Sequence, residues 1–415
     1  MVQVSGIPAA GIIRGLIGPE APIRLIGYDG SKAGPDTAEV TLRISSPRAM
    51  ARLATAPGSL GLARAYVEGE IQVEGDLYTL LNAIADLTLH QLPRAQQARI
   101  ARQLLPLWLR NRMAVPELEY RPLGRLHSKA RDRRAIAHHY DVSNTFYEWV
   151  LGPSMTYTCA VYPHAAATLE EAQAAKHALV ADKLALQPGM RLLDVGCGWG
   201  GMVMHAAAKH GVSALGVTLS ANQAEWAQAE ITRRGLQDLA EVRHLDYRDV
   251  PDERFDAISS IGLTEHIGRA QLPAYFAAMA SRLRPCGRLL NHCITQPRSP
   301  EMYRRDPFIS RYVFPDGQLH SLGHLITVMN DAGFEIRHEE NLREHYARTL
   351  ACWGANLEEH WDEAVAEVGL GRARVWQLYM AASRLGFERD NIQLHQVLGV
   401  RPDGNGGSGF PLRGW

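Results

Sequence analysis

The sequence predicts an α/β protein in which a doubly wound, mostly parallel sheet follows a smaller α+β unit. From about Thr168 onward, apolar strand-like runs alternate with helical stretches, and this alternation is typical of parallel sheets covered by helices. Within it, a strand, a glycine-rich turn and a helix follow one another at LLDVGCGWGG, Leu192–Gly201. At such a junction the backbone approaches a ligand closely, so the sheet is expected to bind a small molecule.

The first 125 residues form the smaller unit in this prediction. Residues 23–28 and 38–45 have the composition of strands on either side of a turn-rich stretch, and helical stretches follow at 47–56 and 76–90. Residues 126–415 form the second domain. Its expected strands and helices are 190–197, 213–220, 240–247, 255–262 and 287–294 (strands) and 222–235 and 271–284 (helices).

Composition excludes several classes of protein. Of the 415 residues, 46% are hydrophobic and 21% charged, as in ordinary globular proteins. No apolar run approaches the ~20 residues of a membrane span, and the N-terminus lacks a secretory signal, so a cytoplasmic location is expected. The formal net charge of zero suggests no nucleic-acid partner. Five scattered cysteines without a CxxC pair indicate neither a disulfide framework nor a metal site.

A basic stretch lies between the two domains. Residues 91–113 place arginines beside leucines and Trp108, and residues 121–134 add further arginines and Lys129. This pattern fits an amphipathic helix attracted to anionic lipid at a membrane surface. It also fits a solvated helix face and linker, and both interpretations stay open.

The glycine turn favours a cofactor other than a dinucleotide. Its glycines do not follow the GxGxxG spacing, and the next strand ends in Thr218, Leu219 and Ser220 instead of an acid. No GK[ST] motif is present, which disfavours phosphate transfer. The carboxylate of Asp194 suits a positively charged ligand without phosphates, such as S-adenosylmethionine, whose adenine end Asp246 could reach. The alternative is that the glycines only pack a helix against a strand.

The motifs outside this turn carry a resemblance to a known family. They are HYDVSNTFYEWVLGPSMTYTCAVYP (139–163), LLDVGCGWGG (192–201), VTLSANQ (217–223), GLTEHIG (262–268), FISRYVFPDG (308–317) and HYARTLACW (345–353). As an ordered set over residues 130–395, they resemble the cyclopropane-fatty-acyl-phospholipid synthases and the related mycolic-acid methyltransferases. The first 125 residues resemble, more loosely, the lipid-associated domain of the full-length bacterial synthases.

The resemblance implies a Rossmann-like methyltransferase domain and a reaction. Such enzymes transfer the methyl of S-adenosylmethionine to a cis double bond of a phospholipid acyl chain, bicarbonate takes a proton from the resulting carbocation, and a ring closes. An alkene is a poor nucleophile, so the site must be dry and aligned, and the aromatic residues of 140–162 suit a developing cation. The family also implies attachment to the inner face of the cell membrane and a homodimer.

Site residues follow from the matched motifs. The bicarbonate site is expected at Cys159, Glu265, His292, the backbone of Ile294, and Tyr346. The cofactor residues are expected to be Tyr140, Tyr157, Thr158, Asp194, Gly196, Gly198, Thr218, Leu219, Gln223, Asp246, Tyr247 and Ile261. Taken singly, each catalytic residue also has an ordinary structural explanation, such as a buried cysteine, a satisfied histidine or a capping acid.

Some positions depart from the family or leave choices open. Thr264 stands where many members have Phe, and residues 291–295 are NHCIT where many have LHTIG, so acyl-chain and head-group preference stays open. No catalytic cysteine is assigned near Ser383. Tyr312 and Phe314 are expected either to contact the acyl chain or to lie in the core. The intact bicarbonate set favours ring closure over a methylene or methyl branch, and over a non-catalytic lipid-binding protein.

Overall fold

The computed structural model describes residues 8–56, 58–85, 114–120, 124, 127–129, 131, 132, 134, 143–251, 253–298 and 306–413. Its contacts divide the chain into two compact units. The first unit comprises Met1–Arg121, Asp306–Val313 and Trp361–Leu385, and the second comprises Pro122–Arg305, Phe314–His360 and Gly386–Trp415. The fold class expected from the sequence is confirmed: a mostly parallel Rossmann-like sheet accompanies a smaller N-terminal α+β region.

The first unit contains a four-stranded sheet in the order β2-β1-β3-β4, where β1 and β3 are parallel and the other two pairs antiparallel. Its N-terminal elements are α1 (Ala9–Ile17), β1 (Ile23–Ile26), β2 (Lys32–Ala33), β3 (Val40–Ile44), α2 (Pro47–Thr55), α3 (Ser59–Val67), β4 (Ile71–Glu74) and α4 (Leu77–Ile84). The side chains of Ser46 and Asp76 cap α2 and α4, which satisfies backbone N–H groups at their first turns. Residues 86–90 of the helix expected at 76–90 lie outside the described residues.

Two later segments also belong to the first unit: a π-helical turn at Ile309–Val313, and α14 (Trp361–Val368) with most of α15 (Leu370–Glu388). The sequence-based division placed both in the second domain. Long-range contacts explain the difference: Tyr66 Oη donates a hydrogen bond to Gln377 Oε1 (2.5 Å), and the guanidinium of Arg384 lies 3.6 Å from the centre of the Tyr78 ring. Contacts of this kind between distant parts of the chain are not visible in local patterning.

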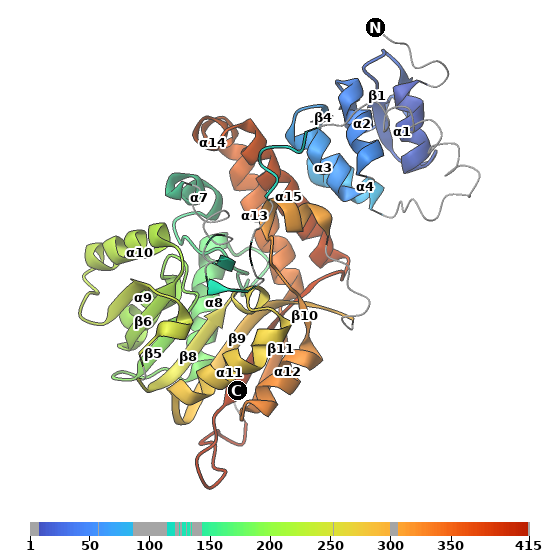
Figure 1. The fold of residues 1–415 in the computed structure, drawn as a ribbon. Helices are drawn as coiled ribbons and strands as arrows, with labels where there is room; N and C mark the ends of the chain where they lie inside the picture. Colours follow the sequence, from blue (N-terminus) through green and yellow to red (C-terminus); the bar gives the residue numbers. More distant parts are fainter. Residues whose placement is uncertain are drawn as a thin grey trace. The chain divides into compact units, whose positions relative to one another are not determined.

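The second unit contains a sheet in the order β11-β12-β9-β8-β5-β6-β7, with the short β10 paired to β9 (Figure 1). The strands are β5 (Arg191–Val195), β6 (Ser213–Thr218), β7 (Ala240–His244), β8 (Phe255–Ile261), β9 (Leu283–Gln296), β10 (His320–Ser321), β11 (Glu335–Asn341) and β12 (Gln393–Val400). Strands β5 to β9 pair in parallel, whereas β12 and β11 are antiparallel. All five strands expected in this region are present.

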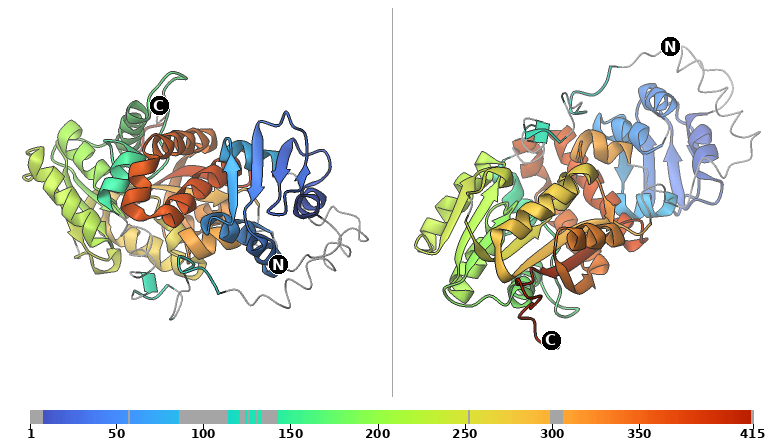
Figure 2. Two further views of the ribbon diagram at one scale, coloured as in Figure 1. Left: turned by 90° about the horizontal axis from the view of Figure 1, so that it is seen from above. Right: turned by 60° about the horizontal axis from the view of Figure 1, so that its bottom comes forward.

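Helices cover both faces of this sheet (Figures 1 and 2). The helices of this unit are α7 (Asn144–Leu151), α8 (Leu169–Leu184), α9 (Gly201–His210), α10 (Ala221–Arg233), α11 (Leu272–Arg282), α12 (Leu322–Asp331) and α13 (Arg343–Glu359). Helices α8 to α12 pack on strands of the sheet, and α7 packs on α13 and α10. Successive strand residues enter different cores: Leu192 packs with residues of α8, α9 and α10, and Leu193 packs with residues of α11 and α12. This alternation follows from the two-residue repeat of a strand and explains why the successive residues Leu192 and Leu193 are both apolar.

Strand order locates the ligand-binding edge. Strand β5 lies between β6 and β8, so connections leave its two sides in opposite directions. At such a reversal, ligands bind beyond the carboxyl ends of the strands. In the part of the chain that the structure describes, no helix is long and apolar enough to cross a membrane, and no cluster of metal-ligating side chains is found.

Candidate active site

Asp194 is the last polar residue of β5 before the glycine turn. It is buried, and its Oδ1 accepts a hydrogen bond from Ser259 Oγ on the neighbouring strand β8 (2.6 Å). Burial raises the pKa of Asp194 to about 6. Because desolvation disfavours the carboxylate, a cationic ligand beside it is stabilised more strongly than at an exposed acid.

The glycine turn leaves room beside this carboxyl. Gly196, Gly198 and Gly200 have φ values of 75°, 54° and 78°, in the region that favours glycine. A Cβ placed on Gly198 would meet no atom within 4 Å, whereas one on Gly196 would lie 3.2 Å from Leu263. The backbone at Gly198 therefore faces open space, which fits a cofactor held close to the turn.

Lys176 of α8 is a buried cation of this site that sequence analysis did not select. Its Nζ donates hydrogen bonds to Thr158 Oγ1 and to His177 Nε2, both at 3.1 Å. Burial lowers the pKa of Lys176 to about 8, opposed by the negative charge of the nearby Asp194. No ion pair within 4 Å involves Lys176 among the described residues. A hydroxyl and an imidazole thus hold its Nζ, and its charge also acts on the Asp194 carboxyl.

The other expected cofactor residues lie at the ends of three strands. At the end of β6, Thr218 Oγ1 donates to Gln223 Oε1 (2.8 Å), and Leu219 follows in the loop that leads to α10. After β7, both carboxylate oxygens of Asp246 accept hydrogen bonds from Arg248 (2.8 and 2.6 Å). Ile261 is buried at the end of β8. Tyr140 lies outside the described residues.

Aromatic rings form a continuous series beside the glycine turn. Tyr147 lies 4.7 Å from Trp199 and 6.0 Å from Tyr157 between ring centres, and Tyr157 lies 5.3 Å from Trp353. Trp353 in turn makes an edge contact with Tyr346. The expected cofactor residue Tyr157 and the expected catalytic residue Tyr346 thus belong to one aromatic wall, whose π faces suit positive charge.

Glu265 lies in the short 3-10 helix Thr264–His266, after β8. Its Oε1 accepts a hydrogen bond from the backbone N–H of Ile294 (2.6 Å), and its Oε2 is buried without a partner among the described residues. Burial raises the pKa of Glu265 to about 7. A carboxyl with one free oxygen and a pKa near neutrality can take or give a proton in the working pH range.

His292 of β9 lies two residues before Ile294. Its Nδ1 meets Gln396 Nε2 of β12 (3.1 Å), while its Nε2 is buried and has no partner in the described part of the chain. Burial, reinforced by the charge of Lys176, lowers the pKa of His292 well below the ordinary value. The imidazole is therefore neutral, and the hydrogen bond at Nδ1 fixes its orientation.

Cys159 and Tyr346 meet around the backbone of Leu342. The Cys159 thiol is fully buried and lies within hydrogen-bonding distance of the Leu342 carbonyl (3.8 Å), and the Tyr346 N–H donates to that same carbonyl (3.2 Å). Burial raises the pKa of the Cys159 thiol, so the thiol is protonated. The charge of Lys176 reaches both Cys159 and His292.

The two departures from the family pattern meet each other. Thr264 Oγ1 donates a hydrogen bond to Asn291 Oδ1, and Asn291 Nδ2 donates to Cys293 Sγ (3.2 Å). Thr264 and Asn291 are buried, and each is the chain neighbour of an expected catalytic residue. This chain therefore has a hydrogen-bonded polar pair beside Glu265 and His292, at two positions where many family members have the apolar residues Phe and Leu.

Comparison with known proteins identifies the family. The family model described as mycolic acid cyclopropane synthetase matches residues 127–397. The chain belongs to this family. It is similar over nearly its whole length to a "probable fatty acid methyltransferase" of Mycobacterium tuberculosis, with 53% identity over 404 residues, 95% of this chain and 94% of the relative. The cyclopropane-fatty-acyl-phospholipid synthase of Escherichia coli is 36% identical over 284 residues, 68% of this chain and 72% of the synthase.

Solved structures show the same fold. The cyclopropane synthase MmaA2 of Mycobacterium tuberculosis matches with a TM-score of 0.62 and 34% identity, over 66% of this chain and 100% of that one. The mycolic acid cyclopropane synthase CmaA1, complexed with SAH and CTAB, matches with a TM-score of 0.61 and 33% identity, over 64% and 97%. The chain is therefore an S-adenosylmethionine-dependent methyltransferase of the mycolic acid cyclopropane synthetase family.

Proposed function

We propose that this methyltransferase alkylates a cis double bond of an unsaturated fatty acyl chain and leaves the added carbon as a methylene branch. Relatives aligned along nearly the whole chain support the branch. Besides the 53% identical protein, they include a "tuberculostearic acid methyltransferase" of Mycobacterium tuberculosis, 32% identical over 393 residues, 92% of this chain. The cyclopropane-forming relative aligns over 284 residues only. The ring-forming activity favoured by the motifs alone becomes the second candidate.

Atom balance selects the methylene branch over a saturated one. Addition of a methyl cation to one alkene carbon leaves a carbocation on the other, and loss of a proton from the new methyl group then closes a ring. If a hydride first shifts from the methyl-bearing carbon to its cationic neighbour, loss of the same proton gives a methylene group. A saturated methyl branch needs an added hydride as well. S-Adenosylmethionine supplies the methyl group but no hydride, so saturation of the branch belongs to a separate reducing step.

Glu265 carries the proposal. Its free Oε2 and raised pKa provide a proton acceptor in a buried site, and the reaction releases one proton per turnover. Asp194, the turn at Gly198, Thr158 and Thr218 with Gln223 would hold the cofactor. The aromatic wall would face the developing cation and exclude water.

Ring closure stays the second candidate because of a specific observation. Glu265 Oε2 and His292 Nε2 are both buried and without partners among the described residues. The segments that carry them are joined by the hydrogen bond from the Ile294 N–H to Glu265 Oε1. A small oxyanion such as bicarbonate would satisfy both a hydrogen-bond donor and an acceptor there. The proposal extends to phospholipid acyl chains at the inner face of the cell membrane and to a homodimer, as the resemblance implies.

The product decides between the candidates. The protein is incubated with S-adenosylmethionine carrying a 13C-labelled methyl group and with vesicles of a cis-oleoyl phospholipid, and the fatty esters are analysed by NMR. The two products are isomers, so mass alone does not separate them. Vinylidene carbon signals would support the methylene branch, and cyclopropane signals would show ring closure instead. Unlabelled esters, from a protein preparation that binds S-adenosylhomocysteine, would contradict both candidates.

A further inference from the structure

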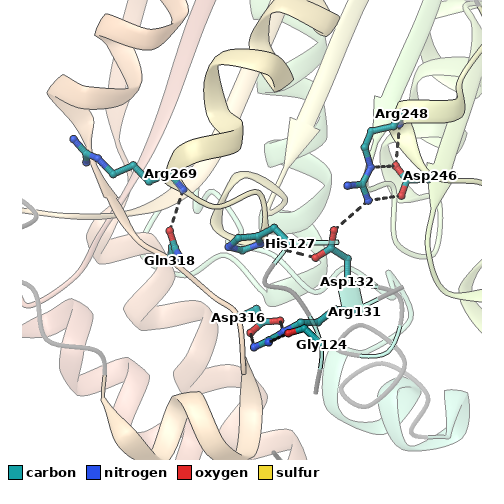
Figure 3. A network of polar contacts seen from close by, with 9 residues as sticks. All are labelled: Gly124, His127, Arg131, Asp132, Asp246, Arg248, Arg269, Asp316 and Gln318. Atoms are coloured by element: carbon teal, nitrogen blue, oxygen red, sulfur yellow. Dashed lines mark hydrogen bonds and ion pairs between the residues drawn. The ribbon is translucent and has the colours of Figure 1, made fainter. Parts of the chain in front are cut away.

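A short stretch before the aromatic-rich motif is tied to the edge of the sheet where the site lies (Figure 3). We call the described residues of this stretch, which are 124, 127–129, 131, 132 and 134, the strap. Arg131 makes a two-pronged contact with Asp316, with Nε–Oδ2 and Nη2–Oδ1 both 2.7 Å, and its Nη1 donates to the Gly124 carbonyl (2.6 Å). Both side chains of this ion pair are largely buried, and this planar geometry is the strongest that arginine makes with a carboxylate.

The second anchor of the strap lies on the cofactor side. Asp132 Oδ2 accepts a hydrogen bond from Arg248 (3.1 Å), the same guanidinium that holds both oxygens of Asp246. Tyr247 lies between Asp246 and Arg248 in the sequence. Its ring centre is 5.4 Å from the Arg248 guanidinium and 5.1 Å from the centre of the Tyr275 ring. Asp132 thus completes the network that fixes the loop after β7.

The first anchor lies on the side of Glu265. Two residues beyond Asp316, the backbone N–H of Gln318 donates to the Glu265 carbonyl (2.8 Å), and Gln318 Oε1 accepts from the N–H of Arg269 (2.9 Å). His127 of the strap packs against Gly268, where a Cβ would lie 2.2 Å from His127 Nε2. Gly268 has φ +79°, so both its conformation and its space require glycine.

We propose that Arg131 and Asp132 are positioning residues that hold the two halves of the reaction at a fixed spacing. Through Asp132 the strap fixes the loop after β7 that carries Asp246 and Tyr247. Through Arg131 and His127 it fixes the loops after β8 and β9 that carry and support Glu265. The strap therefore joins the carboxyl ends of strands on both sides of β5, across the edge where ligands bind.

The two anchors predict two different kinetic defects. Asp132→Asn weakens the hold on the cofactor loop, so the Kd for S-adenosylhomocysteine rises about tenfold while kcat at saturating cofactor changes little. Arg131→Gln loosens the support of Glu265, so kcat falls about tenfold while that Kd stays within about twofold. The role of Glu265 rests on the proposed function, whereas the cofactor measurement rests on the family alone.

Lys129→Gln is the matched control. Lys129 lies in the same strap and pairs with Asp249 at 2.6 Å, but both side chains are about half exposed, and such pairs contribute little. We expect its Kd and kcat to equal those of the unmodified protein. The double variant Arg131→Asp with Asp316→Arg, which restores opposite charges, is expected to recover kcat.

The experiment measures S-adenosylhomocysteine binding by calorimetry, methyl transfer to a micellar oleoyl lipid, and the melting temperature for each variant. Lower melting temperatures with unchanged Kd and kcat would make the strap a structural staple and overturn the inference. Equal defects in all three single variants would overturn it too. If the unmodified protein transfers no methyl group to lipid, the proposed function fails, while the Kd of Asp132→Asn still supports or contradicts the cofactor anchor.

Discussion

Two buried carboxylates of the second unit, Asp194 and Glu265, differ from the buried carboxylates of the first unit. They also differ from Asp246 and Asp316 of their own unit, because arginines hold both of those. In the first unit, Glu119 Oε1 and Oε2 accept from Arg64 (2.8 and 2.7 Å), and Glu70 accepts from the buried Arg52 (2.7 Å). In the second unit, Asp194 has a serine hydroxyl as partner, and Glu265 has one backbone N–H and one oxygen without a partner among the described residues. No guanidinium neutralises either of these two.

The difference separates stability from chemistry. A carboxylate held by an arginine fork stays ionised and makes its bonds in the resting fold. A carboxyl buried with too few donors is destabilised as an anion, so its pKa rises and it can exchange a proton with a ligand.

The largest effect is expected for Glu265→Gln. Glutamine keeps the shape and can still accept from Ile294, but it cannot take up the released proton. Turnover should fall by about 10²–10⁴-fold, the range of general acid–base contributions, with S-adenosylhomocysteine affinity nearly unchanged. Methyl transfer and calorimetry check this, with the exposed Glu241→Gln as control. A parallel loss of affinity would show that Glu265 supports the cofactor site or the fold.

Arg64→Met is expected to have the opposite signature. It leaves the carboxylate of Glu119, whose side chain is 1% exposed, without its fork, and such a loss costs about 3–5 kcal/mol. Denaturant unfolding should show this loss while S-adenosylhomocysteine affinity stays the same. Arg43→Met is the control, since Arg43 and Glu74 form a pair with both side chains at least 40% exposed and worth about 0–1 kcal/mol. Equal losses in the two variants would remove the contrast.

The sequence predicted the sheet well because its strands carry strong local signals. Apolar runs marked the five strands from β5 to β9, and the glycine turn marked the ligand edge, so the sequence alone was enough to select Asp194. Motifs likewise selected Glu265 and His292. None of these choices required knowledge of which strands are neighbours.

The partners of these residues could not be predicted. Ser259, Gln396 and Lys176 lie on strands and a helix whose local patterns are unremarkable, and they matter because neighbouring elements bring them to Asp194, His292 and Thr158. Lys176 lies in an alanine-rich helix with charges all along it, so nothing local marks it as buried. The sequence did mark residues 264 and 291 as departures from the family pattern, but only the fold shows that these two residues are in contact.

A smaller effect is expected for Thr264→Val, which removes a hydroxyl at nearly constant shape. Asn291 Oδ1 then loses its buried donor, at a cost of about 1–3 kcal/mol in the free energy of unfolding. Because Glu265 and His292 adjoin the pair, the proportion of branched and cyclised product should also change. Thr327→Val, an exposed helical threonine bonded to the Gly323 carbonyl, is expected to stay within about 0.5 kcal/mol. Identical behaviour of the two variants would deny the pair a role.

The last prediction concerns the change in the free energy of unfolding with pH, which is small from one pH value to the next. Burial raises the pKa of Glu265 from 4.5 to about 7 and that of Asp194 from 3.8 to about 6. Between the unfolded and folded values the folded state binds more protons, so the free energy of unfolding falls as pH rises through this window, by up to about 1.4 kcal/mol per pH unit and group. Turnover changes in the other direction, since the proton acceptor is the carboxylate and forms as pH passes about 7.

Comparing urea unfolding of the unmodified protein with Glu265→Gln from pH 4.5 to 7.5 isolates the contribution of Glu265. The difference should decline up to about pH 7 and then level off. A difference that rises with pH would mean that the folded protein stabilises Glu265 as an anion, and would place it with the carboxylates that serve the stability of the fold.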